Sequence, residues 1–441
     1  MTAVASSVDA AVAAARHAFD ETDWPTSPAR DRARVLTRAA ALLREREDEL
    51  ARTITAELGK PITLARTEVR LTADLFEYYA ALALTLRGEA VSQHTPEALG
   101  LVLREPVGVV AMITPWNFPL LLVAWKVGPA IAAGCTMIAK PAEQTPGPAF
   151  DLAAVLADAG APEGVFSVVP GDGPTVGGAL ARHHGVDKVA FTGSTAVGAQ
   201  ILAAAGSNIK KVSLELGGKS PNIVFADADL ARAARGAFWG IFLNSGQACQ
   251  AGSRLLVQRS VHDEFVAILV EQAQRARAGD PFDERTMIGP LVDERQAATV
   301  ADYIERGVAE GARLLVGGGR DGLFVEPTVF DDVTPDMTIA REEIFGPVLS
   351  VLTFEDAEDA VQLANDSLYG LAAAVWTRDV SVAVKTAKAI RAGTVWVNAY
   401  HDAGLAFVLP FGGYKQSGFG RELGREGLDE YLATKAIHVA L

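Results

Sequence analysis

One cysteine of this 441-residue sequence stands where a nucleophile could be presented. Cys249 follows a Gly-Gln pair in the run Phe242–Cys249. A thiol at such a junction between a loop and a helix can attack a carbonyl carbon. The alternative is a buried, inert thiol, the common fate of a free cysteine. That inert role is the one we predict for Cys135, which lies in an apolar stretch with strand character.

A glutamate and an asparagine could assist such a nucleophile. Glu215 lies between two leucines at the end of a predicted strand, where a carboxylate can act as a general base. The alternative for Glu215 is a salt-bridged residue near a domain hinge. Asn117 follows the predicted strand Gly108–Ile113, and its amide could donate to a developing oxyanion. The alternative for Asn117 is a rigid turn between two prolines.

Two glycine-bearing turns compete for the role of a phosphate site. Gly171–Gly177 is nearer to the dinucleotide fingerprint, but its spacing differs and Pro174 removes an amide donor. Phe191–Gly198 follows the predicted strand Lys188–Phe191 and offers amides and hydroxyls at the start of a helix, which is typical of an anion site. These residues alone leave the choice between the two turns open.

The elements that position these residues follow from hydrophobic spacing. Up to about residue 85 the spacing predicts helices. One helical segment starts with Ser27 as N-cap and Pro28 in the first helical position and ends at Gly59. From Gly108 onward short β-branched runs alternate with helical stretches, and a second such series begins near Gly218. This order predicts an α/β protein with parallel sheets. The predicted strands are Gly108–Ile113, Thr136–Ala139, Val165–Val169, Lys188–Phe191, Lys211–Leu214, Asn222–Ala226, Arg254–Gln258, Ala312–Val316, Val348–Phe354, Ala372–Trp376 and Thr394–Val397.

Composition and charge exclude several classes of protein. The formal net charge is −14 with no basic block, so no nucleic-acid partner is expected. No apolar stretch approaches the roughly 18 residues of a membrane span, and no basic-apolar leader opens the chain, so we expect no membrane association and a cytoplasmic location. The two cysteines cannot supply a disulfide framework, and the seven histidines lack metal-ligand spacing. We therefore predict no metal.

In this order, the motifs resemble those of the aldehyde dehydrogenase superfamily, from about Val8 to Leu441. The stretches that carry the resemblance are Leu214–Pro221, Phe242–Arg254, Thr114–Pro119, Lys140–Glu143, Glu342–Pro347 and Pro410–Gly413. The resemblance implies a Rossmann-type coenzyme domain, an α/β catalytic domain and a small bridging sheet that serves oligomerisation. The implied bounds are 1–87 and 107–217 for the coenzyme domain, 218–428 for the catalytic domain, and 88–106 and 429–441 for the bridging segments.

The resemblance also implies a reaction, the NAD(P)-dependent oxidation of an aldehyde to a carboxylic acid. It makes Cys249 the nucleophile, Glu215 the base that activates the hydrolytic water, and Asn117 an oxyanion donor beside the Cys249 backbone amide. Lys126 and Glu422 match positions that pass the proton outward. Relatives that transfer the acyl group to coenzyme A lack this glutamate, so a free acid is the expected product. The alternatives are a coenzyme A-acylating or semialdehyde-specific member, or a catalytically silent homologue.

The implied cofactor is NAD, with NADP as an alternative. Its implied residues are Trp116, Lys140, Glu143, Gly173, Gly193, Ser194, Gly198, Leu216, Glu343 and Phe345. Lys140 and Glu143 are expected at the adenine ribose, the turn Phe191–Gly198 at the pyrophosphate, and Glu343 with Phe345 at the nicotinamide ribose and ring. Glu143 could accept a hydrogen bond from the ribose 2′-hydroxyl and would repel a 2′-phosphate, so a preference for NAD is expected.

Substrate specificity does not transfer with the resemblance. The positions that match the family's substrate tunnel are Leu122, Trp125, Phe242, Leu243 and Phe411, with core packing as the alternative for each. They predict an apolar or aromatic-lined pocket for a small-molecule aldehyde. The stretch Asn398–Leu409, which matches the tunnel loop, is longer than usual.

Two further expectations concern the ends of the sequence. Ala436–Leu441 is largely apolar and makes a poor free edge strand, and in the family it pairs across subunits, so a homodimer or homotetramer is expected. Family members usually carry several tens of residues, including a strand pair, ahead of the helix that starts near Ser7. If translation starts upstream, the added residues should pair a sheet edge and raise the melting temperature.

Overall fold

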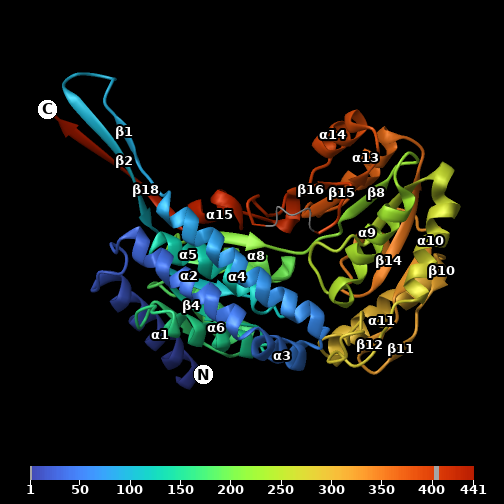
Figure 1. The fold of residues 1–441 in the computed structure, drawn as a ribbon, viewed down its shortest axis with the longest axis horizontal. Helices are drawn as coiled ribbons and strands as arrows, with labels where there is room; N and C mark the ends of the chain where they lie inside the picture. The colour runs from blue at the N-terminus through green and yellow to red at the C-terminus, as the bar shows by residue number, and fades with distance from the viewer. Residues whose placement is uncertain (1, 402–406) are drawn as a thin grey trace.

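Three sheets with packed helices make up most of the fold (Figure 1). The structure is a computed structural model that describes residues 2–401 and 407–441. All the strands predicted from the sequence are present, with bounds shifted by no more than two residues. The α/β fold class is therefore confirmed.

Helices fill the first part of the chain, as the hydrophobic spacing predicts. The first four helices are α1 Thr2–Asp20, α2 Ala29–Glu45, α3 Glu47–Leu58 and α4 Ile62–Leu84. Gly59 ends α3 in the left-handed conformation, as expected for a C-cap. The predicted start at Ser27 is wrong by one residue, because α2 begins at Ala29 and Pro28 takes the N-cap position. The Ser27 hydroxyl instead donates to the carbonyl of Trp24.

The first large sheet has the strand order β17-β7-β6-β3-β4-β5. Its strands are β3 Val109–Ile113, β4 Thr136–Lys140, β5 Phe166–Val168, β6 Lys188–Thr192, β7 Lys211–Glu215 and β17 Gly418–Phe419. Helices α5 Leu121–Ala133, α6 Gly147–Asp158, α7 Gly178–Arg182 and α8 Thr195–Ala205 connect the parallel strands. Along β3, Val110 and Met112 face the core beneath α2, α4 and α5, whereas Val109 and Ala111 face α1 and α7. Both faces are therefore buried, as in a doubly wound sheet, and all its strands are parallel except the short edge strand β17.

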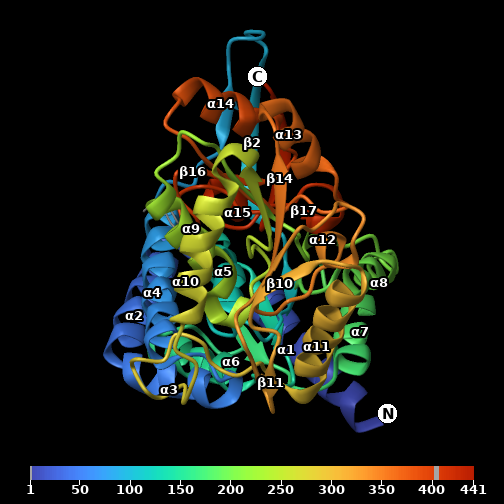
Figure 2. The same cartoon turned by 90° about the vertical axis from the view of Figure 1, so that its right-hand side faces the viewer.

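The second large sheet has the order β10-β13-β14-β9-β8-β15-β16 and is parallel except for β10. Its strands are β8 Pro221–Val224, β9 Arg254–Gln258, β10 Arg313–Val316, β13 Thr328–Asp331, β14 Val348–Phe354, β15 Ala372–Trp376 and β16 Thr394–Val397. The associated helices are α9 Leu230–Phe242, α10 His262–Gln274, α11 Glu294–Ala309, α12 Thr338–Arg341, α13 Ala357–Asn365 and α14 Val380–Ala389. Figure 2 shows α9 and α10 on one side of this sheet and α11 on the other. A short hairpin, β11 Arg320–Asp321 and β12 Phe324–Val325, lies beside the first residue of α11, where Arg320 pairs with Glu294.

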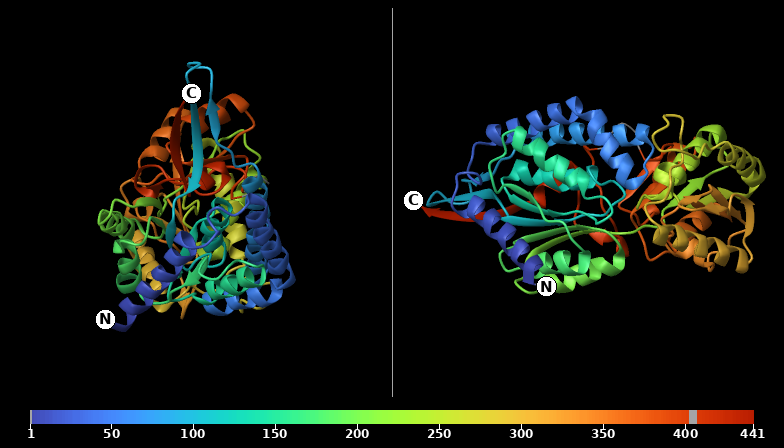
Figure 3. Two further views of the ribbon diagram at one scale, coloured as in Figure 1. Left: turned by 90° about the vertical axis from the view of Figure 1, so that its left-hand side faces the viewer. Right: turned by 90° about the horizontal axis from the view of Figure 1, so that it is seen from below.

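A small antiparallel sheet projects from the body, with the C-terminus near its tip (Figure 3). It consists of β1 Glu89–Val91, β2 Ala98–Pro106 and β18 Leu432–Ala440, which follows the short helix α15 Gly424–Asp429. The predicted bridging segments thus pair with each other, from Leu432 opposite Pro106 to Ala440 opposite Ala98. Within the described ranges, no helix has the length and apolar character needed to cross a membrane.

Candidate active site

A cleft of about 230 Å³ opens where the strand order of the first sheet reverses. β4 and β5 follow β3 on one side, and β6 and β7 lie on the other, so the carboxyl ends of β3 and β6 meet there. Ligands bind α/β sheets at such switch points. Loops that flank the second large sheet close the opposite wall. The lining residues are Pro115, Trp116, Asn117, Thr192, Gly193, Ser194, Leu216, Gly217, Cys249, Gln296, Glu343 and Phe345.

Cys249 reaches the cleft at the end of a buried turn. Gly246 takes a positive φ of 76°, and a Cβ there would lie 2.1 Å from the carbonyl oxygen of Gly346, so only glycine fits. The Gln247 side chain donates to the carbonyl of Asn244 at 3.1 Å and accepts from the amide of Val292 at 3.0 Å. These contacts fix the half-buried thiol at the cleft wall.

The environment keeps the thiol of Cys249 protonated. Burial raises the pKa of Cys249 to about 12, and the charges of Glu343 and Glu215 raise it too, whereas nearby backbone amides lower it. Reaction therefore requires loss of the proton, because the thiolate is the nucleophile. Cys135 is fully buried outside the cleft, and burial raises its pKa to about 11, which agrees with an inert thiol.

Asn117 lies in the cleft with Cys249, on the link between β3 and α5. Its Nδ2 donates to the carbonyl oxygen of Gln247 at 3.0 Å, which ties it to the cysteine turn. Its Oδ1 has no hydrogen-bond partner among the described residues. Because the amide nitrogen carries two hydrogens, one is available to an oxyanion formed on the substrate.

Glu215 ends β7 directly behind the cleft. Its backbone carbonyl accepts from the amide of Gly193 at 3.0 Å, and its side chain is buried. Neither carboxylate oxygen has a hydrogen-bond partner in the part of the chain that the structure describes. The alternative of a salt-bridged glutamate is therefore wrong, and an unpaired buried carboxylate is a candidate base.

Lys126 and Glu422 lie next to Glu215, as the resemblance implies. Lys126 Nζ donates to Glu422 Oε1, and to the Thr192 hydroxyl at 2.7 Å, so the pair is connected to the cleft wall. Burial raises the pKa of Glu215 well above its ordinary value; the Glu422 charge raises it further, and Lys126 lowers it. The arrangement favours a protonated Glu215, and the positive charge of Lys126 favours its ionised form.

The cofactor residues predicted from the second glycine turn line the cleft. Ser194 is the N-cap of α8, whose first-turn amides lack intrahelical acceptors and suit the anionic pyrophosphate of NAD. Gly198 packs against Leu216 on the same wall. The turn Phe191–Gly198, and not Gly171–Gly177, therefore stands at the cleft.

The opposite wall of the cleft suits a ribose and an aromatic ring. The Glu343 carboxylate accepts from the amide of Gly218 at 3.1 Å, and a Cβ on Gly217 would lie 2.1 Å from it, so that position requires glycine. Burial raises the pKa of Glu343 to about 7. The rings of Trp116 and Phe345 meet edge to face at 5.2 Å between centroids. The residues present thus fit the nicotinamide end of a dinucleotide.

Lys140, Glu143 and Gly173 form a separate cluster outside the lining of this cleft. Glu143 Oε1 accepts from the amide of Gly173 at 2.7 Å and lies 3.4 Å from Lys140 Nζ. The Glu143 side chain is 52% exposed, so its carboxylate retains accessible acceptor sites. Lys140 and Glu143, which the resemblance implies at the adenine ribose, are therefore neighbours, and the predicted cofactor residue Gly173 lies against Glu143.

The predicted tunnel residues divide into two groups. Trp125 and Phe411 face each other edge to face at 5.3 Å between ring centroids, and Trp125 packs with Cys249 against the same apolar cluster. Phe242 instead is fully buried against Phe238 in the core on one side of the second sheet, so core packing accounts for it. Leu122 is buried and Leu243 is half-buried. Of the long stretch Asn398–Leu409, residues 402–406 lie outside the described part of the chain.

Four residues of the cleft lining were not predicted from the sequence. Gln296 of α11 lines it, and its side chain donates to the carbonyl oxygens of Ile344 and Phe345 at 3.1 and 2.9 Å. Nothing in the local sequence marks Gln296, which looks like an ordinary polar residue on an amphipathic helix. Pro115, Thr192 and Gly217 are also in the lining, and their place beside the predicted motifs was the available signal.

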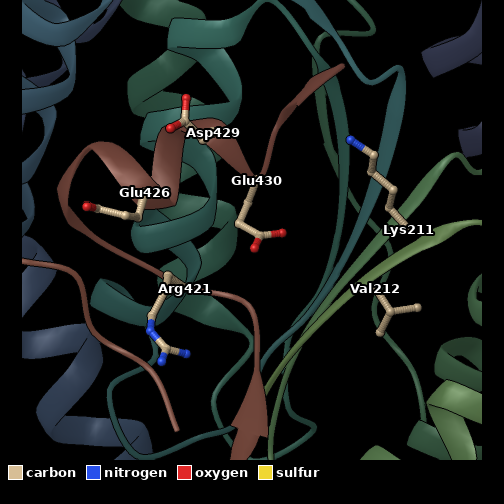
Figure 4. A pocket seen from close by; sticks show the side chains of 6 residues that line it. All are labelled: Lys211, Val212, Arg421, Glu426, Asp429 and Glu430. Atoms are coloured by element: carbon tan, nitrogen blue, oxygen red, sulfur yellow. The ribbon is translucent and has the colours of Figure 1, made fainter. Parts of the chain in front are cut away.

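A second cavity, of about 400 Å³, lies between the start of β7 and the residues of and around α15 (Figure 4). Five charged residues line it together with Val212: Lys211, Arg421, Glu426, Asp429 and Glu430. Beyond the effect of burial, the Arg421 and Glu430 charges shift the pKa of Glu215 in opposite directions. Two charged residues that line this cavity therefore influence the protonation of Glu215.

Comparison with known proteins identifies the class of this chain. A family model described as the aldehyde dehydrogenase family matches residues 1–437. An aldehyde dehydrogenase of Aspergillus niger is 49% identical over 439 residues, 98% of this chain and 87% of that protein. The structure of an NAD-dependent aldehyde dehydrogenase from Sinorhizobium meliloti matches with a TM-score of 0.98 and 49% identity, over 99% of this chain and 88% of that one. An indole-3-acetaldehyde dehydrogenase solved with NAD+ matches with a TM-score of 0.97 and 47% identity, over 99% and 89%.

This chain belongs to the aldehyde dehydrogenase family. The resemblance found in the sequence is therefore confirmed over nearly the whole chain, together with the fold. The enzyme class is an oxidoreductase that acts on aldehydes, and the family's cofactor is NAD(P).

Proposed function

We propose that this chain oxidises an aldehyde to the free carboxylic acid through a thioester on Cys249. One observation carries the proposal: Cys249 and Asn117 share one cleft, and an unpaired buried glutamate, Glu215, lies directly behind it. A catalytically silent homologue would not need to keep this set together.

The residues of the cleft perform the first half of the reaction. The Cys249 thiol loses its proton to solvent, and the thiolate adds to the aldehyde carbonyl. The oxyanion that forms accepts hydrogen bonds from Asn117 Nδ2 and the Cys249 backbone amide. NAD, when held by the α8 turn, Glu343 and Phe345, supplies the acceptor for the hydride that leaves the aldehyde carbon. The acyl group then stays on the Cys249 sulfur as a thioester.

The cluster behind the cleft performs the second half. Glu215 takes a proton from water, the hydroxide displaces the Cys249 sulfur, and the acid is released. Lys126 and Glu422 are hydrogen-bonded to each other, and their charges act on Glu215. They pass that proton away from the site. A panel of aldehydes followed by NADH absorbance tests this function. Product formation that depends on added coenzyme A would instead support an acylating member.

The substrate we propose is an apolar or aromatic aldehyde. Trp125 and Phe411 form an aromatic pair on the same apolar cluster as Cys249. Neither side chain offers a charge to bind the carboxylate of a semialdehyde. In the aldehyde panel, kcat/KM should therefore be higher for aromatic and long aliphatic aldehydes than for semialdehydes. A semialdehyde as the best substrate would contradict this assignment.

We expect a preference for NAD over NADP, set by Glu143. Its carboxylate can accept from the ribose 2′-hydroxyl, and it would repel a 2′-phosphate by like charge, although Lys140 would offset part of that repulsion. Like charges brought together can cost several kcal/mol, so kcat/KM should favour NAD by at least about tenfold. The Glu143→Gln variant should narrow this ratio. Equal use of both cofactors by the unaltered enzyme would show that Glu143 does not face the ribose.

We propose that the enzyme is a homodimer or homotetramer. The projecting sheet carries exposed apolar side chains, Val91, Val439 and Leu441, and a long edge strand of this kind is normally covered by pairing. Light scattering should give a mass of two or four chains. A monomer at micromolar concentration would refute the proposal.

A reducing compartment, the cytoplasm, is the location we propose. Both cysteines are free thiols in the structure, and the proposed reaction needs Cys249 unoxidised. Fractionation of the native cell, with the chain recovered in the cytoplasmic fraction, is the expected result.

A further inference from the structure

A buried ion pair holds the segment that carries Asn117. Lys60 lies in the short link between α3 and α4, and Glu68 lies on α4. Lys60 Nζ donates to Glu68 Oε2, and each side chain is only 1% exposed. Neither residue lines the cleft, and neither has a role in the reaction proposed above.

The pair contacts the segment that runs from Asn117 to the start of α5. Lys60 Nζ donates to the Asn117 carbonyl oxygen at 2.9 Å and lies 3.8 Å from the centroid of the Phe118 ring. Glu68 Oε1 accepts from the amides of Leu120 and Leu121 at 3.0 and 3.1 Å. These amides lie at the start of α5, where no intrahelical acceptor exists. The ion pair therefore fixes the backbone from Asn117 to the first turn of α5.

Stability alone is a weak reason for this arrangement. Two buried charges pay a desolvation cost that their attraction often only balances, and apolar replacements of similar volume are frequently neutral. The other hydrogen bonds of this pair, however, all go to one segment, from Asn117 to Leu121. A hydrogen-bond donor aimed at a developing charge works best when its position is fixed in advance.

We propose that Lys60 and Glu68 are positioning residues that hold Asn117 in the orientation required for its oxyanion hydrogen bond. The inference rests on the proposed function, because it requires Asn117 to be an oxyanion donor. On the other side, Asn244 Nδ2 also donates to the Asn117 carbonyl oxygen at 2.9 Å, which joins this segment to the cysteine turn. The pair thus sets the distance between the Asn117 amide and the Cys249 sulfur.

A double-mutant cycle tests the inference in the full-length enzyme. Asn117→Ala should lower the first-turnover rate of NADH formation by about 100-fold or more, the cost of one lost oxyanion donor. Lys60→Met should lower it by at least about tenfold, because a displacement of about 1 Å is costly in an active site. In the double variant the Lys60 change should cost less than about twofold further, since Asn117 is already absent. The KM for NAD should stay within about twofold throughout.

Two further variants keep the test decisive. Glu68→Gln is isosteric and retains an acceptor for the α5 amides, so it provides a second cycle if Lys60→Met does not fold. Arg32→Met is the matched control, because Arg32 is a buried cation on α2 that donates to the carbonyl of Ala132 at 3.1 Å, away from the cleft. It should lower the melting temperature and leave the first-turnover rate unchanged.

The outcomes distinguish a failure of the positioning role of Lys60 and Glu68 from a failure of the proposed oxyanion role of Asn117. If Lys60→Met or Glu68→Gln costs the same factor with and without Asn117, the pair acts independently of Asn117 and the inference is overturned. A Lys60→Met enzyme with the unaltered rate overturns it as well. If Asn117→Ala itself keeps the unaltered rate, the oxyanion role in the proposed function fails first.

Discussion

The Cys249→Ala variant is expected to lose aldehyde oxidation, with turnover reduced by at least about 10⁴-fold. Alanine removes the sulfur on which both the adduct and the thioester form, and no other cysteine lies in the cleft lining. The Ser194 N-cap, Glu343 and Phe345 are untouched, so NAD binding measured by calorimetry should be retained. Turnover above a few percent of the unaltered enzyme would contradict the nucleophile assignment.

Cys135→Ala is the matched control for that variant. Cys135 is fully buried immediately before β4, and its sulfur donates to the carbonyl of Tyr431 at 3.5 Å. The substitution should cost some stability through a small cavity but leave kcat unchanged. Loss of activity in both cysteine variants with equal loss of melting temperature would point to unfolding rather than chemistry.

Local patterns in the sequence were sufficient to predict most of the strands. Val348–Phe354, Ala372–Trp376 and Thr394–Val397 are short apolar runs bounded by turn residues, and the structure gives β14, β15 and β16 the same bounds. Both faces of β14 and β15 are buried, so a continuous apolar run is the expected signal, whereas β16 is a partly exposed edge strand. β13, Thr328–Asp331, was not predicted, although its four residues are buried and it pairs with β14.

The candidate site was predictable only where chemistry coincides with an unusual local sequence. Cys249 follows a Gly-Gln turn, and Asn117 and the α8 turn each follow a predicted strand. Residues of all three line the cleft. Glu215 was predicted as a base, but its place behind the cleft wall depends on packing around β7 and could not be read from its neighbours.

The residues that support Asn117 could not have been found from the sequence. Lys60 and Asn117 are separated by 57 residues, and Lys60 and Glu68 in isolation look like solvated charges on helices. Only the packing of α4 against α5, side by side in Figure 1, buries the pair and directs it at the loop. Long-range burial of charge leaves no periodic signal.

The Glu215→Gln variant is expected to release about one equivalent of NADH per site in a burst and then to turn over at least about 100-fold more slowly. The amide fills the same space but cannot take a proton from water, so the thioester on Cys249 forms and accumulates. Glu57→Gln is the matched control: burial also raises the pKa of Glu57, but this residue accepts from the amide of Gly147 away from the cleft. It should keep full turnover.

The pH dependence of the steady rate gives the Glu215 assignment a second test. Burial, reinforced by the Glu422 charge, raises the pKa of Glu215 above its ordinary value, so in the unaltered enzyme the active carboxylate is lost as the pH falls through that raised pKa. The steady rate should therefore rise with pH above the usual range of a carboxyl, and Glu215→Gln should lose that rise while its burst keeps the same amplitude. A variant without a burst would place Glu215 in an earlier step, the removal of the thiol proton of Cys249.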